Sequence, residues 1–343
     1  MPRSRRFSRL NWRIIALRRE ISIGIAILSL AGVLAIVAPG YFARENLNDL
    51  FLANMPVLIV AVGVTLVMLI GEIDISVGSA FAICSVTAGV LAKAGLPVPI
   101  ATFGACLVGA ALGAINGSLV AFLRIPSIVA TLATMVALRD GLRWVTEGTW
   151  VQNLPARFQW FGLSQSAYPV LSLAVTAIIV LAMSWGLRHV ALGRFIYAMG
   201  SNSEAARLAG IHTSLLRFSL FVLSGVFTGF AAVLNSVRFN QIPSNTGLGL
   251  EMKVIAGVVV GGTAITGGTG SIVGTVLGVT LLGAIGPALT FIGASAYWER
   301  AIQGGIILAA VVVDALRAHA KRPSGRANHQ GLNKNEPAVA SHA

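Results

Sequence analysis

The chain has 343 residues, of which 56% are hydrophobic and 11% are charged, and its mean hydropathy is +0.82. A soluble domain is about 25% charged, so this chain has too few polar side chains to cover a surface in water. The composition therefore excludes a soluble enzyme, a secreted disulfide scaffold and a disordered protein, and it predicts a chain embedded in lipid. The 38 glycines agree with this, because closely packed membrane helices favour small residues.

The net charge of +13 is concentrated at the two ends of the chain. Seven of the first 19 residues are arginine. The tail holds five more cations, which are Arg317, Lys321, Arg322, Arg326 and Lys334. Cytoplasmic segments of membrane proteins are rich in Lys and Arg, so both termini are predicted to be cytoplasmic. A basic end that binds nucleic acid is the alternative, but no recognition module accompanies it.

Apolar segments of about 20 residues, enough to cross a bilayer, recur along the chain. They lie at 21–39, 50–70, 78–95, 98–122, 127–145, 168–187, 215–236, 252–265, 271–292 and 300–316. The sequence thus predicts an all-α integral membrane protein with about ten transmembrane helices. The fifth segment carries Arg139 and Asp140 and the eighth is short, so eight spans is the alternative. Residues 1–20 are expected to form a basic cytoplasmic arm, 21–317 the transmembrane domain, and 318–343 a disordered cytoplasmic tail.

The string GEIDISVGS at 71–79 places two carboxylates at the inner end of the second segment. Charged groups beside lipid need water or a partner. Asp74 and Ser76 could cap the next helix, or, together with Gly78, they could mark a helix break on a solute pathway. Glu72 and Asp74 could instead carry protons, which would make the protein a proton-coupled secondary transporter.

A glycine-rich string at 257–278 resembles a phosphate loop only in composition. No Lys or Arg lies between Lys253 and Arg300, so a cation that could reach the phosphates is missing. Close helix packing around a break is the better interpretation. The candidate residues are Gly261, Gly262, Gly267 and Gly268. With no ATPase motif and no metal-ligand spacing in the sequence, we expect a transport subunit without metal or cofactor, not an enzyme.

The segment 189–213 contains a short amphipathic stretch between two apolar segments. Ser203 is a plausible N-cap, and a helix over 204–209 would end at Gly210. Glu204 and Arg207 are three residues apart and could pair on one face. Such a short helix needs a surface to dock against, and a solvated loop is the alternative.

Several polar side chains fall within or near the apolar segments. Neutral amides suit a hydroxylated solute, because they both donate and accept hydrogen bonds. They can also bond neighbouring helices, which is the role expected of Asn116. Asn235 and Gln241 are the candidates for a solute pathway. The remaining members of this set are Asn240, Asn245 and Glu251.

These segments carry a family resemblance. GEIDISVGS resembles the signature G-x-I-D-x-S-V-G-S of the ribose-type permeases of ABC importers. ALGRFIYAMGSNSEAARLAGI (191–211) resembles their coupling loop, and GGTAITGGTGSIVGTVLG (261–278) their glycine-rich late helix pair. Other stretches, such as FLRIPSIVATLATM, GTWVQNLPARFQWF, IPSNTGLGLEMKVIAG and AYWERAIQGGIILAAVVVDAL, are most similar to autoinducer-2 and rhamnose permeases. The chain departs from the family at Glu72 and Ser201, where glycine is frequent.

The resemblance implies a bacterial inner-membrane subunit that imports rhamnose, autoinducer-2 or a related monosaccharide. It implies a second permease subunit, identical or paralogous, together with cytoplasmic ATPases that use ATP and a periplasmic solute-binding protein. The short helix would then be the coupling helix that docks on the ATPase. The residues implied in this contact are Gly200, Asn202, Glu204, Ala205, Ala206, Arg207 and Gly210.

Overall fold

The structure is a computed structural model that describes residues 4–295 and 297–320, so most of the predicted tail lies outside the described residues. The described part is helical, as predicted, with one isolated antiparallel bridge between Val151 and Ile242. Its α-helices are α1 (Ser4–Val37), α2 (Arg44–Leu69), α3 (Val77–Lys93), α4 (Val98–Ala121), α5 (Ser127–Thr146), α6 (Tyr168–His189), α7 (Ala191–Ser201), α8 (Ser203–Leu208), α9 (Thr213–Ser236), α10 (Leu250–Val260), α11 (Ile272–Phe291) and α12 (Tyr297–Ala320). Two 3₁₀ turns, η1 (Pro39–Phe42) and η2 (Gln159–Gly162), lie between them.

Each predicted apolar segment contains a helix, but these helices differ in length. Six of the described helices are long and apolar enough to cross a membrane, namely α1, α2, α4, α6, α9 and α11. The prediction of a span at 252–265 is wrong. α10 has 11 residues and is therefore about 16 Å long, roughly half of a hydrocarbon core of about 30 Å. It stops because Gly261 and Gly262 begin a tight turn.

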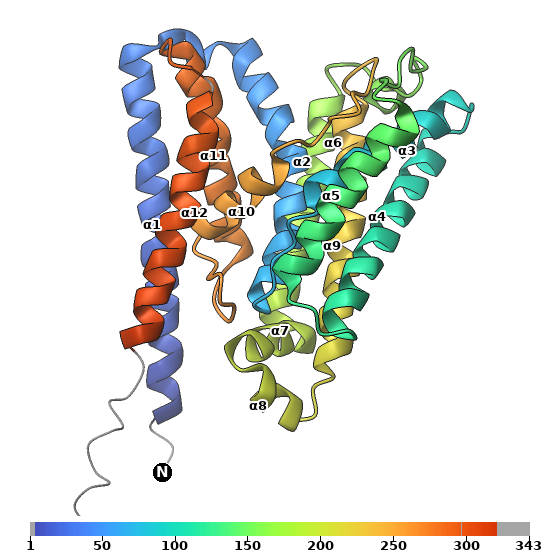
Figure 1. Ribbon diagram of the computed structural model, residues 1–343. Coiled ribbons are helices and arrows are strands. Elements are labelled where there is room, and N and C mark those ends of the chain that lie inside the picture. Colours follow the sequence, from blue (N-terminus) through green and yellow to red (C-terminus); the bar gives the residue numbers. More distant parts are fainter. Residues whose placement is uncertain (1–3, 296, 321–343) are drawn as a thin grey trace, which may run out of the picture.

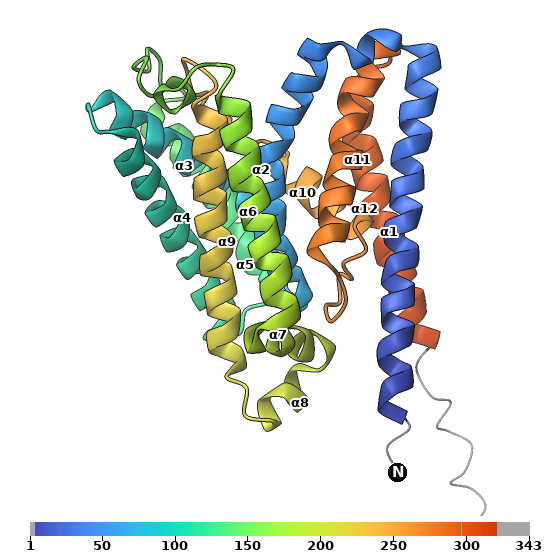
Figure 2. The same ribbon diagram turned by 180° about the vertical axis from the view of Figure 1, so that it is seen from behind.

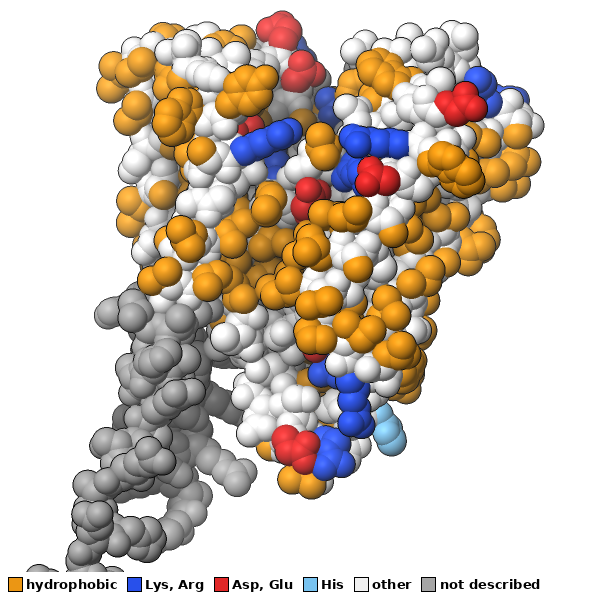
Figure 3. All heavy atoms as spheres, viewed as in Figure 1, with side chains coloured by type: hydrophobic (Ala, Val, Ile, Leu, Met, Phe, Trp, Pro, Cys, Tyr) orange, Lys and Arg blue, Asp and Glu red, His pale blue; other side chains and the backbone are white. Residues whose placement is uncertain are grey.

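The helices form two groups on either side of α2 (Figures 1 and 2). One group contains α1, α10, α11 and α12, and the other contains α3 to α9. The described start of α1, the described end of α12 and the α7–α8 segment all lie at the same end of the molecule (Figure 1). In the space-filling view, a broad hydrophobic band separates charged side chains near the top from those at the α8 end (Figure 3). This banding is typical of a protein that crosses a membrane.

The core is built around α2. Every residue from Asn54 to Leu69 is buried, as expected of a helix that is apolar on all sides. α2 packs against α9, α11, α6 and α10, and so it joins the two groups.

The most extensive helix pair is α4 with α9, and glycines make its close approach possible. A Cβ on Gly109 or Gly113 would overlap carbonyl oxygens of α9, and one on Gly229 would lie 2.5 Å from the carbonyl oxygen of Ala105. Close packing through small residues is the usual way in which membrane helices associate. This pair holds the group of α3 to α9 together.

Candidate functional site

The connection between α2 and α3 is a helix break with a buried polar network. Gly71 turns the chain with φ of +82°. Asp74 Oδ1 accepts hydrogen bonds from Ser76 N at 2.9 Å and from Ser76 Oγ at 2.7 Å. Asn116 Nδ2 of α4 donates to the same hydroxyl oxygen at 2.7 Å, which is the helix-bonding role predicted for it. Neither Asp74 nor Ser76 caps α3 through its side chain. The Asp74 carboxylate and the Ser76 hydroxyl bond each other instead, and the hydroxyl also bonds Asn116 on α4.

Glu72, in the same break, forms an ion pair with a distant residue. Its Oε1 atom lies 2.6 Å from Nε of Arg217, in the second turn of α9. The side chains of Glu72 and Arg217 are 16% and 18% exposed, respectively. Glu72 is thus matched by a permanent cation, and Asp74 by hydrogen-bond donors. Both carboxylates therefore have protein partners within or next to the break.

The loop between α10 and α11 packs against the end of α2. Gly268 N donates a hydrogen bond to the carbonyl oxygen of Leu69 at 2.9 Å. A Cβ on Gly267 would lie 2.6 Å from the backbone nitrogen of Gly71, and one on Gly261 would lie 2.5 Å from a carbonyl oxygen of α11. Only glycine allows backbones to approach this closely. The four predicted glycines all lie in or at the edge of this loop: Gly261, Gly262, Gly267 and Gly268.

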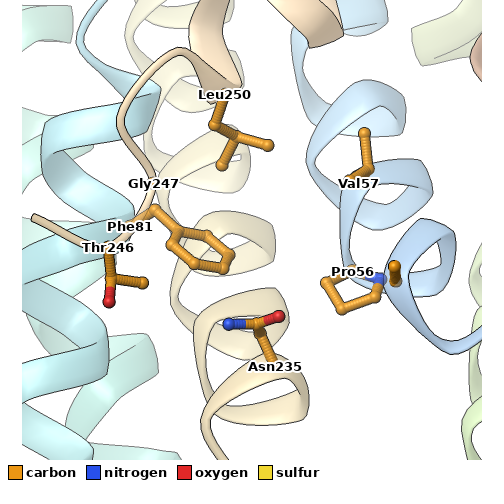
Figure 4. Close-up of a pocket in the computed structure, with 8 residues that line it drawn as sticks. Pro56, Val57, Phe81, Asn235, Thr246, Gly247 and Leu250 are labelled. Carbon is orange, nitrogen blue, oxygen red and sulfur yellow. The ribbon is translucent and has the colours of Figure 1, made fainter. Parts of the chain in front are cut away.

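A cavity of about 150 Å³ lies between α2, α3, α9 and the segment that precedes α10. Figure 4 shows the amide of Asn235 pointing into the space between the ring of Phe81 and Pro56. Gln241, the other predicted pathway amide, lies exposed in the loop after α9 and does not line the cavity. The lining residues are all uncharged: Ala53, Pro56, Val57, Phe81, Asn235, Thr246, Gly247 and Leu250.

A buried charge network supports one wall of this cavity. Arg139 of α5 donates to the carbonyl oxygens of Thr246 and Gly247, at 3.2 and 3.4 Å. Arg139 also interacts electrostatically with Glu251 in the first turn of α10. Both charged residues are buried. A Cβ on Gly78 would overlap the Glu251 carboxylate, so glycine at this position leaves the space that the carboxylate occupies.

The segment 189–213 forms two helices, α7 and α8, which project from one end of the molecule (Figure 1). α8 is the predicted short helix, but its N-cap is Asn202 rather than Ser203. Asn202 has extended backbone angles, and its Oδ1 accepts a hydrogen bond from Ala205 N at 2.9 Å. The helix ends before Gly210, which has φ of +85° as a left-handed C-terminal residue should. α7 was not predicted.

The predicted pair on α8 is present. Arg207 Nη2 lies 2.6 Å from Glu204 Oε1, and Arg207 Nε donates to Glu204 Oε2 at 3.0 Å. The hydrogen bonds from the guanidinium hold the pKa of Glu204 below its usual range. Both side chains are exposed, whereas Ala206 is buried against the rest of the protein. Leu208 is 75% exposed at the end of the helix and was missed as a functional candidate. The signal for it in the sequence was an apolar residue at the end of a short, otherwise amphipathic stretch.

Gly200 at the end of α7 contacts the break directly. A Cβ there would overlap the carbonyl oxygen of Leu69 and would lie 3.0 Å from the Gly268 Cα. The end of α7, the end of α2 and the α10–α11 loop therefore meet at one point. Among the residues that the structure describes, no three potential metal ligands lie together.

Comparison with known proteins assigns the family of a chain that combines these helix breaks with an exposed helix. A family model described as "Branched-chain amino acid transport system / permease component" matches residues 46–311. The chain belongs to this permease family. The permease is 38% identical over 307 residues to the autoinducer 2 import system permease protein LsrC of Yersinia pestis (strain Pestoides F), covering 88% of this chain and 86% of the relative. It is 34% identical over 323 residues to LsrC of Photorhabdus luminescens, covering 92% and 96%. No solved structure matches it.

The family assignment makes this protein the permease component of an ABC importer of the branched-chain and sugar type, similar to autoinducer-2 import permeases. It is a multi-pass membrane protein and a transport subunit, not an enzyme. The predicted family resemblance is confirmed, including the similarity to autoinducer-2 permeases.

Proposed function

We propose that the permease imports a sugar or sugar-like solute, such as autoinducer-2, rhamnose or a related monosaccharide. The observation that supports this most strongly is the uncharged cavity lined by Asn235. A branched-chain amino acid carries an ammonium and a carboxylate, and burying them without charged partners is costly. Hydroxyl groups need donors and acceptors of the kind that an amide offers. The ring of Phe81 provides an apolar surface for the C–H face of a sugar.

The proposed orientation places both chain ends in the cytoplasm of a bacterial cell, with the permease in the inner membrane. The cations near both termini support this. The α7–α8 segment lies at the same end of the molecule as the described chain ends, which puts it on the side where ATP is available.

The proposed partners are a cytoplasmic ATPase that uses ATP, a second permease subunit (identical or paralogous) and a periplasmic solute-binding protein. α8 would dock in a groove of the ATPase, with Gly200, Asn202, Glu204, Ala205, Ala206, Arg207 and Gly210 forming or supporting the contact. A helix of six residues is far too short to be stable alone. It also presents an exposed leucine, Leu208, beside a charged pair, which suits helix-in-groove binding.

Uptake by the reconstituted complex tests the solute. Proteoliposomes that contain the permease, its ATPase and its binding protein would be given labelled autoinducer-2, rhamnose or leucine. We expect ATP-dependent uptake of a sugar-like solute and none of leucine. Asn235→Ala should reduce uptake about fivefold, because a lost hydrogen bond to solute is worth about 1 kcal/mol. Asn240→Ala, at an exposed amide outside the cavity, is the matched control. Leucine uptake, or equal loss in both variants, would contradict the proposal.

Co-purification with the ATPase tests the docking role of α8. Leu208→Asp and Glu204→Lys should insert into the membrane normally but lose the ATPase. Leu163→Asp changes an exposed leucine in the loop at the opposite end of the molecule and should retain it. Retention of the ATPase by both α8 variants would show that the docking surface lies elsewhere.

A further inference from the structure

The Glu72–Arg217 ion pair joins two parts of the permease, the α2–α3 break and α9. Four ion pairs occur among the described residues. Two of them, Asp140–Arg143 and Glu204–Arg207, are local pairs within one helix. Glu72–Arg217 is the pair that connects the α2–α3 break to α9. Both of its side chains are more than four-fifths buried, so water screens their attraction less than that of a surface pair.

One side of the pair leads to the exposed helix α8. Four residues, from Ala209 to His212, separate α8 from the start of α9 at Thr213. Ile211 N donates to the carbonyl oxygen of Ala206 at 3.1 Å, which ties this short linker to α8. Arg217 lies in the second turn of α9. A short linker and the first turns of α9 thus form a direct path along the chain from α8 to Arg217.

The other side of the pair leads to the cavity. Next to Glu72, the backbone N–H groups of Ile73 and Ile75 donate to the side-chain oxygens of Ser127 and Thr131 on α5, at 3.1 and 3.2 Å. Further along, the buried Asp74–Ser76–Asn116 network precedes α3, and α3 carries the cavity residue Phe81. Movement of Glu72 would thus reposition the start of α3 and the residues that line the cavity.

The Arg217 charge depends on this contact. Its Nε atom is buried and forms no hydrogen bond with any described residue, so the Glu72 carboxylate 2.6 Å away compensates its charge. Separating the two groups would leave a partly buried charge without a partner, which is unfavourable. The break and α9 are therefore expected to move together.

We propose that the Glu72–Arg217 ion pair transmits the movement of α8 to the α2–α3 break, and through α3 to the cavity residue Phe81, and so couples ATP hydrolysis to solute movement. This inference rests on the proposed docking of α8 on an ATPase. Glu72 and Arg217 are positioning residues in this scheme, since neither lines the cavity.

The test measures autoinducer-2 uptake and ATP hydrolysis in the same proteoliposomes containing the full complex. Glu72→Gln and Arg217→Gln should keep the ATPase bound and hydrolysing ATP, while solute transported per ATP falls about tenfold, within the range typical of coupling energies. The charge-swapped double variant Glu72→Arg/Arg217→Glu should recover most of the wild-type ratio of solute transported to ATP hydrolysed. Glu299→Gln breaks another partly buried interhelical pair, with Lys253, and should leave the ratio unchanged.

A second readout does not depend on the solute. In a Cys84→Ala/Cys106→Ala background, a cysteine placed at the cavity residue Ala53 would be labelled with a maleimide, with and without ATP and vanadate. We expect a nucleotide-dependent labelling rate that is lost in Glu72→Gln and regained in the charge swap. Arg217→Lys keeps the cation and should retain the nucleotide-dependent labelling; if Arg217→Gln does not fold, Glu72→Gln carries the test.

The outcomes separate the two proposals. If the wild-type complex shows neither ATP-driven uptake nor nucleotide-dependent labelling, the proposed function fails. If the wild type shows both and the single variants match it, or if the swap recovers nothing although it binds the ATPase, the coupling role of the ion pair is overturned.

Discussion

Gly200 gives the sharpest test of how the α7–α8 segment meets the end of α2 and the α10–α11 loop. In Gly200→Ala, the added Cβ would overlap both atoms of the hydrogen bond between Gly268 N and Leu69 O. It would also lie 3.0 Å from the Gly268 Cα, whereas carbon atoms normally pack at about 3.5–4.0 Å. The end of α7 must therefore retreat from the end of α2 and from the α10–α11 loop.

The expected cost combines three effects. Overpacking costs about 1–3 kcal/mol, and the weakened hydrogen bond about 1 kcal/mol. Alanine forms helix better than glycine, which adds about 1 kcal/mol to the free energy of unfolding at this position of α7. The net effect is a loss of about 2 kcal/mol in the free energy of unfolding. For a chain of 343 residues this corresponds to a Tm lower by roughly 3 °C.

Thermal unfolding of the purified permease measures this change, and Gly186→Ala is the matched control. Gly186 is also helical and near the same end of the molecule, but a Cβ there meets no atom within 4 Å. The control should gain up to about 1 kcal/mol from helix propensity alone. The two variants should therefore shift Tm in opposite directions. A Gly200→Ala variant as stable as Gly186→Ala would refute the packing argument.

Two further predictions concern the polar network and the exposed pair. Ser76→Ala removes the hydroxyl that joins Asp74 to Asn116. It should lower the free energy of unfolding by about 2 kcal/mol, because buried polar atoms lose a partner. In the same experiment, Ser219→Ala, at an exposed position of α9, should change the free energy of unfolding little. The depressed pKa of Glu204 means that its interaction with the neighbouring arginine is present above the usual carboxylate pKa and is lost only as pH falls through the lower folded-state value. ATPase co-purification should therefore stay constant between about pH 6 and 8, and a loss within that window would show that a different group controls docking.

The family resemblance and much of the local structure could be predicted from the sequence. The low charge and long apolar runs require helices in lipid, since a backbone in hydrocarbon must satisfy its own hydrogen bonds. The α8 helix, its Glu204–Arg207 pair and its end at Gly210 depend on residues within one turn of each other. The break at 71–76 was visible because charged residues interrupt an apolar run.

Only the tertiary structure decided which distant groups meet. Hydropathy placed a span at 252–265, but the backbone turns at Gly261 and leaves α10 as a half-helix. Glu72 pairs with Arg217 on α9, and Arg139 donates hydrogen bonds to carbonyl oxygens in the segment before α10. The cavity combines residues from α2, α3, α9, α10 and the segment before α10. Apolar length and helix propensity are local properties that can be read along the chain. Which side chains pair between helices depends on how the helices pack. The number of residues between two side chains in the sequence does not say how far apart they lie in the folded protein.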